Sequence, residues 1–262
     1  MIKILVPVDF SDTSINALQF AIDLFKGRSL KITVLHTYGT PSSAFHMKSL
    51  DRVLEEDAER ELNQLIRRFE QSEPDVLLKP LNLKGDAVHT VNSIADKGEH
   101  DLVVMGTKGA SGLKEVFMGS VAGGVVKGTV APVLVVPAGV KFNGLAKMVL
   151  AIGEAPSDTE RLIATLRQIK ETRGSEIDLF HIGEESDMEE LIAPFKELDP
   201  VVTLAQGTGD VNKQLNTHLA KVNGDMLCLI RSKRGFFEGF FHESVTLQQT
   251  FHSPVPVLVL HN

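Results

Sequence analysis

Short apolar runs alternate along the chain with longer stretches in which apolar residues recur every three or four positions. Each run in the first half is four to seven residues long, which is typical of a buried strand. The stretches between the runs carry the helical period, and Leu62, Leu65, Ile66 and Phe69 mark one side of a long helix whose other side is charged. We expect strands at 4–8, 32–36, 77–83, 102–105 and 133–136, with helices between them.

Strands that are separated by helices predict right-handed crossovers and a parallel sheet with helices on both faces. This arrangement is the doubly wound α/β fold. Its ligands bind beyond the carboxyl ends of the strands, at the point where the strand order reverses. Asp9 follows the first expected strand and Gly106 follows the fourth, so we expect both residues at that edge of the sheet.

The same succession of runs occurs twice in the chain. A shift of 124 residues aligns Asp101 with Asp225 and the run APVLVV with VPVLVL near the C-terminus. Near the start of each half, KILVPVD from Lys3 aligns with KMVLAIG from Lys147, a larger shift because the second half has fewer residues between these points. Such self-similarity indicates a repeated structural unit. We predict two tandem doubly wound units, 1–138 and 146–262, each a five-stranded parallel sheet with helices on both faces.

The apolar runs that end the two units are expected at sheet edges, where exposed backbone groups favour pairing with another strand. We therefore expect 133–136 to pair with 257–260 within one chain, which makes an intrachain pseudo-dimer of the two units. His36 and His181 end matching strands, and this repetition favours a structural role for both histidines over a catalytic one.

The stretch from 101 to 136 joins an expected strand, a glycine-rich loop and the start of a helix. Its glycines follow the spacing G-x2-G-x9-G-S, from Gly106 through Gly109 to Gly119 and Ser120. Glycines allow close approach of the backbone, and the unpaired N–H groups at a helix start attract phosphate. The pattern indicates an anion site, and a tight loop without a ligand is the structural alternative.

This spacing, between an apolar strand and the run PVLVV, resembles the nucleotide-binding signature of the ATP-binding universal stress proteins. The resemblance implies an adenine nucleotide alpha hydrolase-like fold for each unit. It also implies that the loop holds the phosphates and ribose of ATP, AMP or ADP, with or without magnesium, while an aspartate after the first strand contacts the adenine end. Carried over by position, the implied site residues are Pro7, Asp9, Thr37, Met105, Gly106, Gly109, Gly119, Ser120 and Val121. Thr37 stands where the family usually has an apolar residue.

The second unit departs from this pattern at nearly every implied contact. A carboxylate at the Glu243 position would repel phosphate, and larger side chains there would prevent close backbone approach. We therefore expect the second unit to keep the fold without the nucleotide site. Basic and aromatic residues at 231–241 have two interpretations. They form a site for a different anion or a partner surface, or they are the counterparts of mostly apolar loop positions in the first unit. The aligned pairs are Gly106 with Ile230, Gly109 with Lys233, Gly119 with Glu243, and Asp9 with Gly153.

Composition and charge exclude several other classes of protein. The formal net charge of −7 over 262 residues provides no electrostatic footprint for nucleic acid. The single cysteine, Cys228, lies in an apolar run, excludes an intramolecular disulfide and fits a reducing compartment. The N-terminus lacks the basic head and cleavage site of a signal peptide, and no apolar run approaches the roughly 18 residues of a membrane helix. We expect a cytoplasmic protein with neither a nucleic-acid nor a membrane partner.

Other catalytic and metal-binding motifs are absent from the sequence. There is no GxxxxGK[ST] phosphate loop, no G-x-S-x-G nucleophile elbow and no H-E-x-x-H metal pair. We predict no metal ligands and no catalytic residues. The leading hypothesis is a stress-response sensor or regulator that binds an adenine nucleotide in its first unit and acts on an unknown protein partner. A slow ATPase and a nucleotide-independent interaction module are the alternatives, and the resemblance also implies that two chains can form a homodimer.

Overall fold

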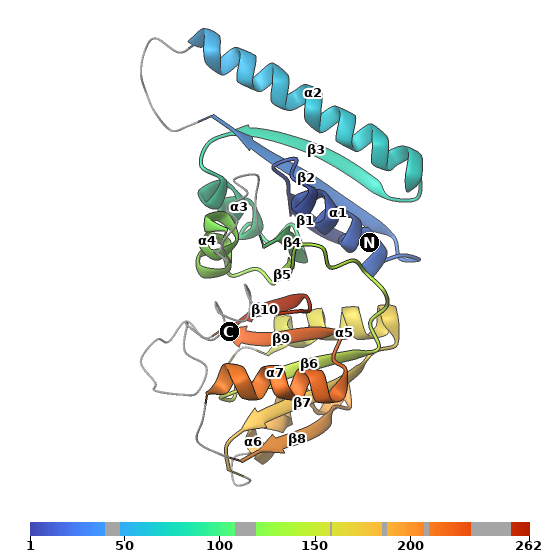
Figure 1. Ribbon diagram of the computed structural model, residues 1–262, viewed down its shortest axis with the longest axis vertical. Coiled ribbons are helices and arrows are strands. Elements are labelled where there is room, and N and C mark those ends of the chain that lie inside the picture. The colour runs from blue at the N-terminus through green and yellow to red at the C-terminus, as the bar shows by residue number, and fades with distance from the viewer. Residues whose placement is uncertain (40–47, 108–118, 158, 185–187, 207–209, 232–252) are drawn as a thin grey trace.

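A computed structural model describes residues 1–39, 48–107, 119–157, 159–184, 188–206, 210–231 and 253–262 (Figure 1). We call residues 1–138 the N-terminal half and residues 146–262 the C-terminal half. The N-terminal half contains β1 (Ile2–Pro7), α1 (Asp12–Leu24), β2 (Leu30–Tyr38), α2 (Lys48–Ser72), β3 (Leu77–Lys84), α3 (Ala87–Ala95), β4 (Leu102–Gly106), α4 (Ser120–Gly128) and β5 (Val133–Val136). The C-terminal half contains β6 (Lys147–Ile152), α5 (Glu160–Arg173), β7 (Glu176–Ile182), α6 (Met188–Ile192), the 3-10 helix η2 (Ala193–Leu198), β8 (Val201–Ala205), α7 (Val211–Val222), β9 (Met226–Arg231) and β10 (Val257–His261).

All ten described strands form one sheet in the order β3-β2-β1-β4-β5-β10-β9-β6-β7-β8. Read outward from its centre, the sheet has the same order of corresponding strands in each half. Every neighbouring pair is parallel except β5 and β10, which run antiparallel with Val135 opposite Val257 and Val133 opposite Val259. The expected α/β fold with a mainly parallel sheet is confirmed, and so is the pairing of the last strand of each half.

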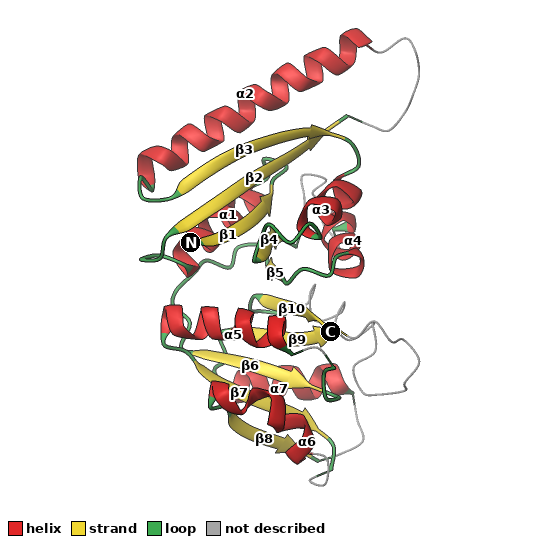
Figure 2. Cartoon of the chain, turned by 180° about the vertical axis from the view of Figure 1, so that it is seen from behind, coloured by secondary structure: helices red, strands yellow, loops and turns green. Residues whose placement is uncertain are grey.

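Helices cover both faces of this sheet (Figure 2). Side chains alternate along each strand, so in β1 Ile4 and Val6 pack in the layer that contains α1, α2 and α5, while Leu5 packs in the layer that contains α3, α4 and α7. Strands that are covered on both faces require apolar side chains at consecutive positions. This double burial explains why the strands appear in the sequence as continuous apolar runs.

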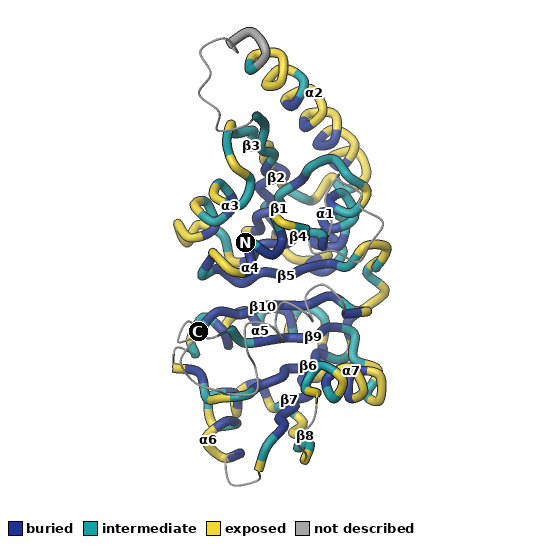
Figure 3. The backbone as a smooth tube through the Cα atoms, turned by 60° about the vertical axis from the view of Figure 1, so that its left-hand side comes forward, coloured by how far each residue is buried: buried dark blue, intermediate teal, exposed yellow. Residues whose placement is uncertain are grey.

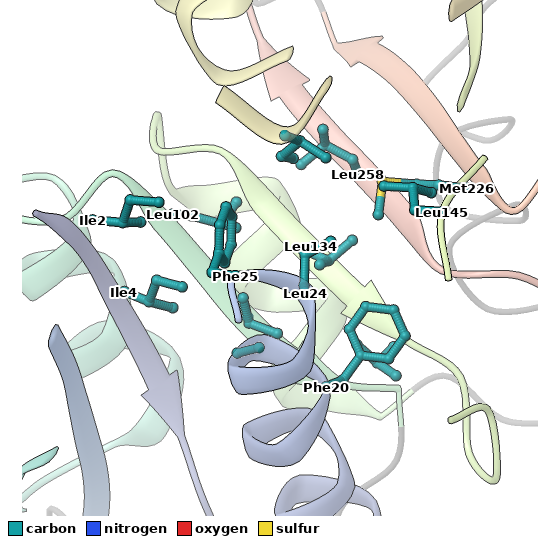
Figure 4. Close-up of a cluster of buried hydrophobic side chains, with 14 of the residues drawn as sticks. Ile2, Ile4, Phe20, Leu24, Phe25, Leu102, Leu134, Leu145, Met226 and Leu258 are labelled. Atoms are coloured by element: carbon teal, nitrogen blue, oxygen red, sulfur yellow. The ribbon is translucent and has the colours of Figure 1, made fainter. Parts of the chain in front are cut away.

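The junction of the two halves is part of the hydrophobic core. Figure 3 shows β5 and β10 side by side and buried, and no residue of β5 exposes measurable surface. Leu134 lies opposite Leu258, and both belong to one apolar cluster with Phe20 and Leu24 of α1 (Figure 4). Each fully buried side chain of this size contributes about 1.5–3 kcal/mol. The cluster therefore holds the two halves together as one body.

Small differences from the expected boundaries have local causes. The first strand ends at Pro7 instead of Val8, because the chain turns there towards the cap of α1, although the Val8 N–H still donates to the Leu35 carbonyl at 2.8 Å. Cys228 is fully buried, as its apolar surroundings predicted. Within the described part of the chain, no helix has both the length and the apolar character needed to cross a membrane.

Candidate functional site

A cavity of about 300 Å³ lies beyond the carboxyl ends of β1, β2 and β4, beside the starts of α3 and α4. The chain passes from β1 to β2 on one side, whereas β4 adjoins β1 on the other side. This is the point at which the strand order reverses, where doubly wound folds bind their ligands. The volume is at the lower end of the range for small-molecule sites.

The structure brings together all but one of the residues that the resemblance implied. These eight residues line the cavity from four separate segments of the chain: Pro7, Asp9, Thr37, Met105, Gly106, Gly119, Ser120 and Val121. The ninth, Gly109, lies outside the described residues. Among the described lining residues, the only ionisable side chains belong to Asp9 and His36.

Asp9 lies in a tight turn between β1 and α1. Its Oδ1 accepts hydrogen bonds from the Ser11 hydroxyl at 2.6 Å and the Ser11 N–H at 3.2 Å, and its own N–H donates to the Ser14 hydroxyl at 3.3 Å. Ser11, rather than Asp9, is the N-cap of α1, because its Oγ accepts from the Ser14 N–H. Asp9 therefore orients the residue that caps the helix while its carboxylate lines the cavity.

Phe10, within the same turn, has a positive φ of 63°. This left-handed conformation is unusual for a bulky side chain, and such strain occurs often at functional sites. The Phe10 ring lies against the imidazole of His36, with 4.4 Å between the ring centroids. The ring contact and the hydrogen bonds of Asp9 hold the turn in its strained form.

Gly106 ends β4 where the start of α1 passes very close. A Cβ at this position would come within 2.6 Å of Thr13 Cγ2 and 3.0 Å of the Thr13 carbonyl oxygen. A larger residue would displace α1 from β4. Packing alone therefore requires glycine here, and the position provides no independent evidence for a ligand.

The start of α4 lines the same cavity as the Asp9 turn. The Gly119 N–H donates to the Thr107 carbonyl at 3.2 Å, and the Thr107 N–H donates to the Val136 carbonyl at 3.1 Å. Gly119 is the N-cap of α4 and provides no side-chain cap. The first N–H groups of a helix have no partners within the helix, and together with the dipole they favour an anion. The cavity is thus lined both by a carboxylate and by a helix start of the kind that favours anions.

The cavity is also lined by eight residues that were not predicted from the sequence. Most are apolar or small and form its walls: Val8, Ser14, Leu35, His36, Ala87, Val91, Thr107 and Ala122. Several directly precede or follow a predicted residue, so their position at the strand ends was the available signal. The start of α3 could not be placed beside these strand ends without the three-dimensional structure, whereas the resemblance had already implied the start of α4 as part of the site.

His36 and His181 have the repeated structural role that their matching positions predicted. The Nδ1 of His36 bonds the Val8 carbonyl at 2.8 Å, and the Nδ1 of His181 bonds the Ile152 carbonyl at 2.8 Å. A carbonyl oxygen only accepts, so each Nδ1 carries the proton. In the neutral ring, Nε2 is then the acceptor. Because His36 also lines the cavity, it combines support of the β1 end with a place in the site.

The C-terminal half carries different residues at the corresponding strand ends. Gly153 follows β6, and Ile230 occupies the place of Gly106 in β9. The counterparts of Gly109, Gly119 and Ser120 lie outside the described residues; they are Lys233, Glu243 and Ser244. Among the residues that the structure does describe, no group of three or more His, Cys, Asp or Glu side chains could hold a metal ion.

Residues 1–137 match the family model described as the Universal stress protein family. The chain is 31% identical over 140 residues to Universal stress protein MJ0531 of Methanocaldococcus jannaschii, a match that covers 51% of this chain and 81% of that protein. It is 29% identical over 144 residues to Universal stress protein YxiE of Bacillus subtilis, which covers 51% of this chain and 97% of that protein.

A solved structure extends the likeness beyond the N-terminal half. The crystal structure of a universal stress protein from Archaeoglobus fulgidus superimposes with a TM-score of 0.78 over 99% of this chain and 98% of that chain. The sequences are 20% identical, so this likeness concerns the fold alone.

Proposed function

The chain belongs to the universal stress protein family, and we propose that its N-terminal half binds ATP or another adenine nucleotide. The observation that carries this proposal is that one cavity is lined both by the Asp9 carboxylate and by the start of α4, which has no side-chain cap. A nucleotide has hydrogen-bond donors at its base and ribose and negative charge at its phosphates, so it can use both groups.

Each part of the cavity has a distinct role in this proposal. Asp9 accepts a hydrogen bond from the adenine amino group or a ribose hydroxyl. The backbone N–H groups of Gly109, Ser120 and Val121 donate to the phosphates, where the helix dipole stabilises negative charge. The Gly119 N–H is already held by the Thr107 carbonyl, so Gly119 contributes by leaving room for a phosphate beside the helix start. The apolar side chains of the wall exclude water from the base.

Magnesium has a limited role in this proposal. The ion usually keeps several water ligands and binds nucleotides through phosphate oxygens. The described residues provide no carboxylate cluster for it. Magnesium would therefore accompany the phosphates of ATP, and the protein would hold the phosphates rather than the ion.

In this proposal the protein acts as a sensor or regulator. The bound nucleotide stabilises one conformation of the chain, and a protein partner recognises that conformation. Only a ligand that binds two conformations with different affinity can shift the balance between them. The proposed signal therefore depends on nucleotide occupancy of the N-terminal half.

Calorimetric titration with ATP, AMP and adenosine, each with and without magnesium, tests the proposal. We expect one site per chain, with weaker binding as phosphates are removed, because α4 recognises the phosphates. Asp9→Ala should lower the affinity for all three ligands. Asp12→Ala is the matched control, because Asp12 is a neighbouring acidic residue outside the cavity lining. Absence of heat for every ligand would contradict nucleotide binding and favour an interaction module. If the chain hydrolyses ATP and Asp9→Ala abolishes that hydrolysis, the same site also has a slow ATPase activity.

A further inference from the structure

Two of the helices that start at the cavity, α1 and α4, end against the C-terminal half. The N-cap of α1, Ser11, lies two residues after Asp9, and α4 begins with Ser120. The last four carbonyl groups of a helix have no partners within the helix, and that end carries the negative pole of the dipole. In both helices, an arginine from the C-terminal half supplies the missing donor.

At the end of α4, the donor is Arg231, the last residue of β9. Its Nη1 donates to the Lys127 carbonyl at 2.7 Å and to the Val126 carbonyl at 3.2 Å. His261 of β10, the neighbour of Arg231 across the strand pair, bonds the same Val126 carbonyl through Nε2 at 3.0 Å. The carbonyl accepts, so Nε2 is the donor. Two side chains of the C-terminal half therefore hold the last turn of α4.

At the end of α1, the donor is Arg173, the last residue of α5. Its Nε donates to the Leu24 carbonyl at 2.6 Å, and α1 has no basic residue of its own in its last turn. The guanidinium carbon lies 4.8 Å from the ring centroid of Phe142 in the segment between the halves. Phe142 in turn contacts Phe20 of α1 edge-to-face, with 5.3 Å between ring centroids. A cation over an aromatic ring is itself stabilised, so Arg173 is held at this helix end.

Arg231 also occupies a position in the C-terminal half that corresponds to a cavity residue of the N-terminal half. Arg231 directly follows Ile230, the counterpart of Gly106, so it occupies the position that Thr107 has in the N-terminal half. Thr107 begins the loop at the cavity, whereas Arg231 extends across the junction to α4. The strand end that lost its glycine thus supports the corresponding site of the other half.

We propose that Arg231 and Arg173 are positioning residues of the N-terminal site, through which the C-terminal half sets the place and charge of α4 and α1. This inference rests on the proposed nucleotide binding for its ligand, but the positioning itself does not. A nine-residue helix is about 14 Å long, so a cation at its end acts on a phosphate at its start mainly by fixing the helix and only weakly through space. Neither arginine contacts the nucleotide.

Amide hydrogen exchange of the nucleotide-free full chain tests the positioning by itself. We expect Arg231→Met to accelerate exchange in peptides that cover 119–128 by about threefold to tenfold, the size of a helix-end charge effect. Arg173→Met should act in the same way on 12–24, and Arg231→Lys should restore most of the protection because it retains the charge. Arg167→Met is the control, since Arg167 also lies on α5 but pairs with Glu197 within its own half. Unchanged exchange in α4 and α1 would overturn the inference.

Nucleotide titration of the same variants separates the inference from the proposed function. We expect Arg231→Met to lower the affinity for ATP by about threefold to tenfold and the affinity for adenosine by less, because α4 faces the phosphates. A purely structural defect would weaken both ligands alike and would contradict the positioning of the phosphate end. If the unaltered chain binds no nucleotide, the proposed function is wrong, and the exchange experiment alone decides whether the arginines position the helices.

Discussion

The N–H of Gly119 donates to the carbonyl oxygen of Thr107 across 3.2 Å, so the chain enters α4 at the point where it left β4. This hydrogen bond places the first turn of a helix directly at the end of a central strand. Position 119 therefore lines the cavity beside the helix start that we propose to hold the phosphates. The properties of a side chain at this position should decide whether a phosphate binds.

Gly119→Glu should abolish ATP binding and leave the fold intact. The backbone of Gly119 has φ −57° and ψ 120°, which other residues adopt without strain, so the substitution should change the unfolding free energy by less than about 0.5 kcal/mol. The added carboxylate repels phosphate at close range. Gly119→Gln, of similar size but uncharged, is the control in calorimetric titration and should retain more affinity. Undiminished ATP affinity in a folded Gly119→Glu protein would remove this position from the site.

Gly124→Ala should separate α3 from α4. A Cβ at Gly124 would come within 2.7 Å of both methyl groups of Val88, and a β-branched side chain has little freedom to move away. We expect destabilisation by about 1–2 kcal/mol after the better helix propensity of alanine is included, measured by urea unfolding. Adding Val88→Ala should recover most of the loss. If the double variant is no more stable than Gly124→Ala, the close contact is not the cause.

His218→Leu should strongly destabilise the protein. The Nε2 of His218 lies 3.0 Å from Asp178 Oδ2 in the core, and its ring stacks on Phe180 with 4.1 Å between centroids. Removal of the histidine leaves the buried carboxylate without this partner, at a cost of about 3 kcal/mol. The double variant with Asp178→Val should be clearly more stable than His218→Leu alone in a double-mutant cycle. Additive losses from the two substitutions would show that the side chains do not depend on each other.

His100 should make stability depend on pH in the weakly acidic range. Burial lowers the pKa of His100 from its ordinary value of 6.5, although the nearby Glu99 and Asp101 act in the opposite direction. The unfolded chain therefore takes up this proton at a higher pH than the folded chain. The contribution of His100 to the free energy of unfolding is therefore complete above about pH 6.5. It is lost as the pH falls towards the lower pKa of the folded chain. Measuring the free energy of unfolding of His100→Gln and of the unaltered chain at pH 7.5 and pH 5.5 isolates the contribution of His100. An equal pH dependence in both proteins would contradict the lowered pKa.

The sequence predicted the strand succession because strands buried on both faces leave continuous apolar runs. The junction was predictable for the same reason, since Val133–Val136 and Val257–His261 are apolar strands that would otherwise be exposed at an edge. The strand pattern placed Asp9 at the edge of the sheet where the strand order reverses, and Gly119 was identified through the glycine spacing and the resemblance. The cavity then placed them together at the reversal of strand order.

Contacts between residues far apart in the sequence could not be predicted in this way. Arg173 meets the Leu24 carbonyl across 149 residues, and nothing in either local pattern indicates the other. The need for glycine at position 106 was also hidden, because it depends on how closely Thr13 of α1 approaches β4. Such constraints arise from packing between elements, which a residue pattern does not contain.

The most direct test of the central claim is to denature the chain as purified from cells and to identify any released nucleotide by chromatography and mass. A titration with ATP and magnesium then measures the number of sites per chain. We predict about one adenine nucleotide per chain in total, held by the N-terminal half. Two per chain would contradict the loss of the site from the C-terminal half. No released nucleotide together with no heat on titration would contradict nucleotide binding altogether.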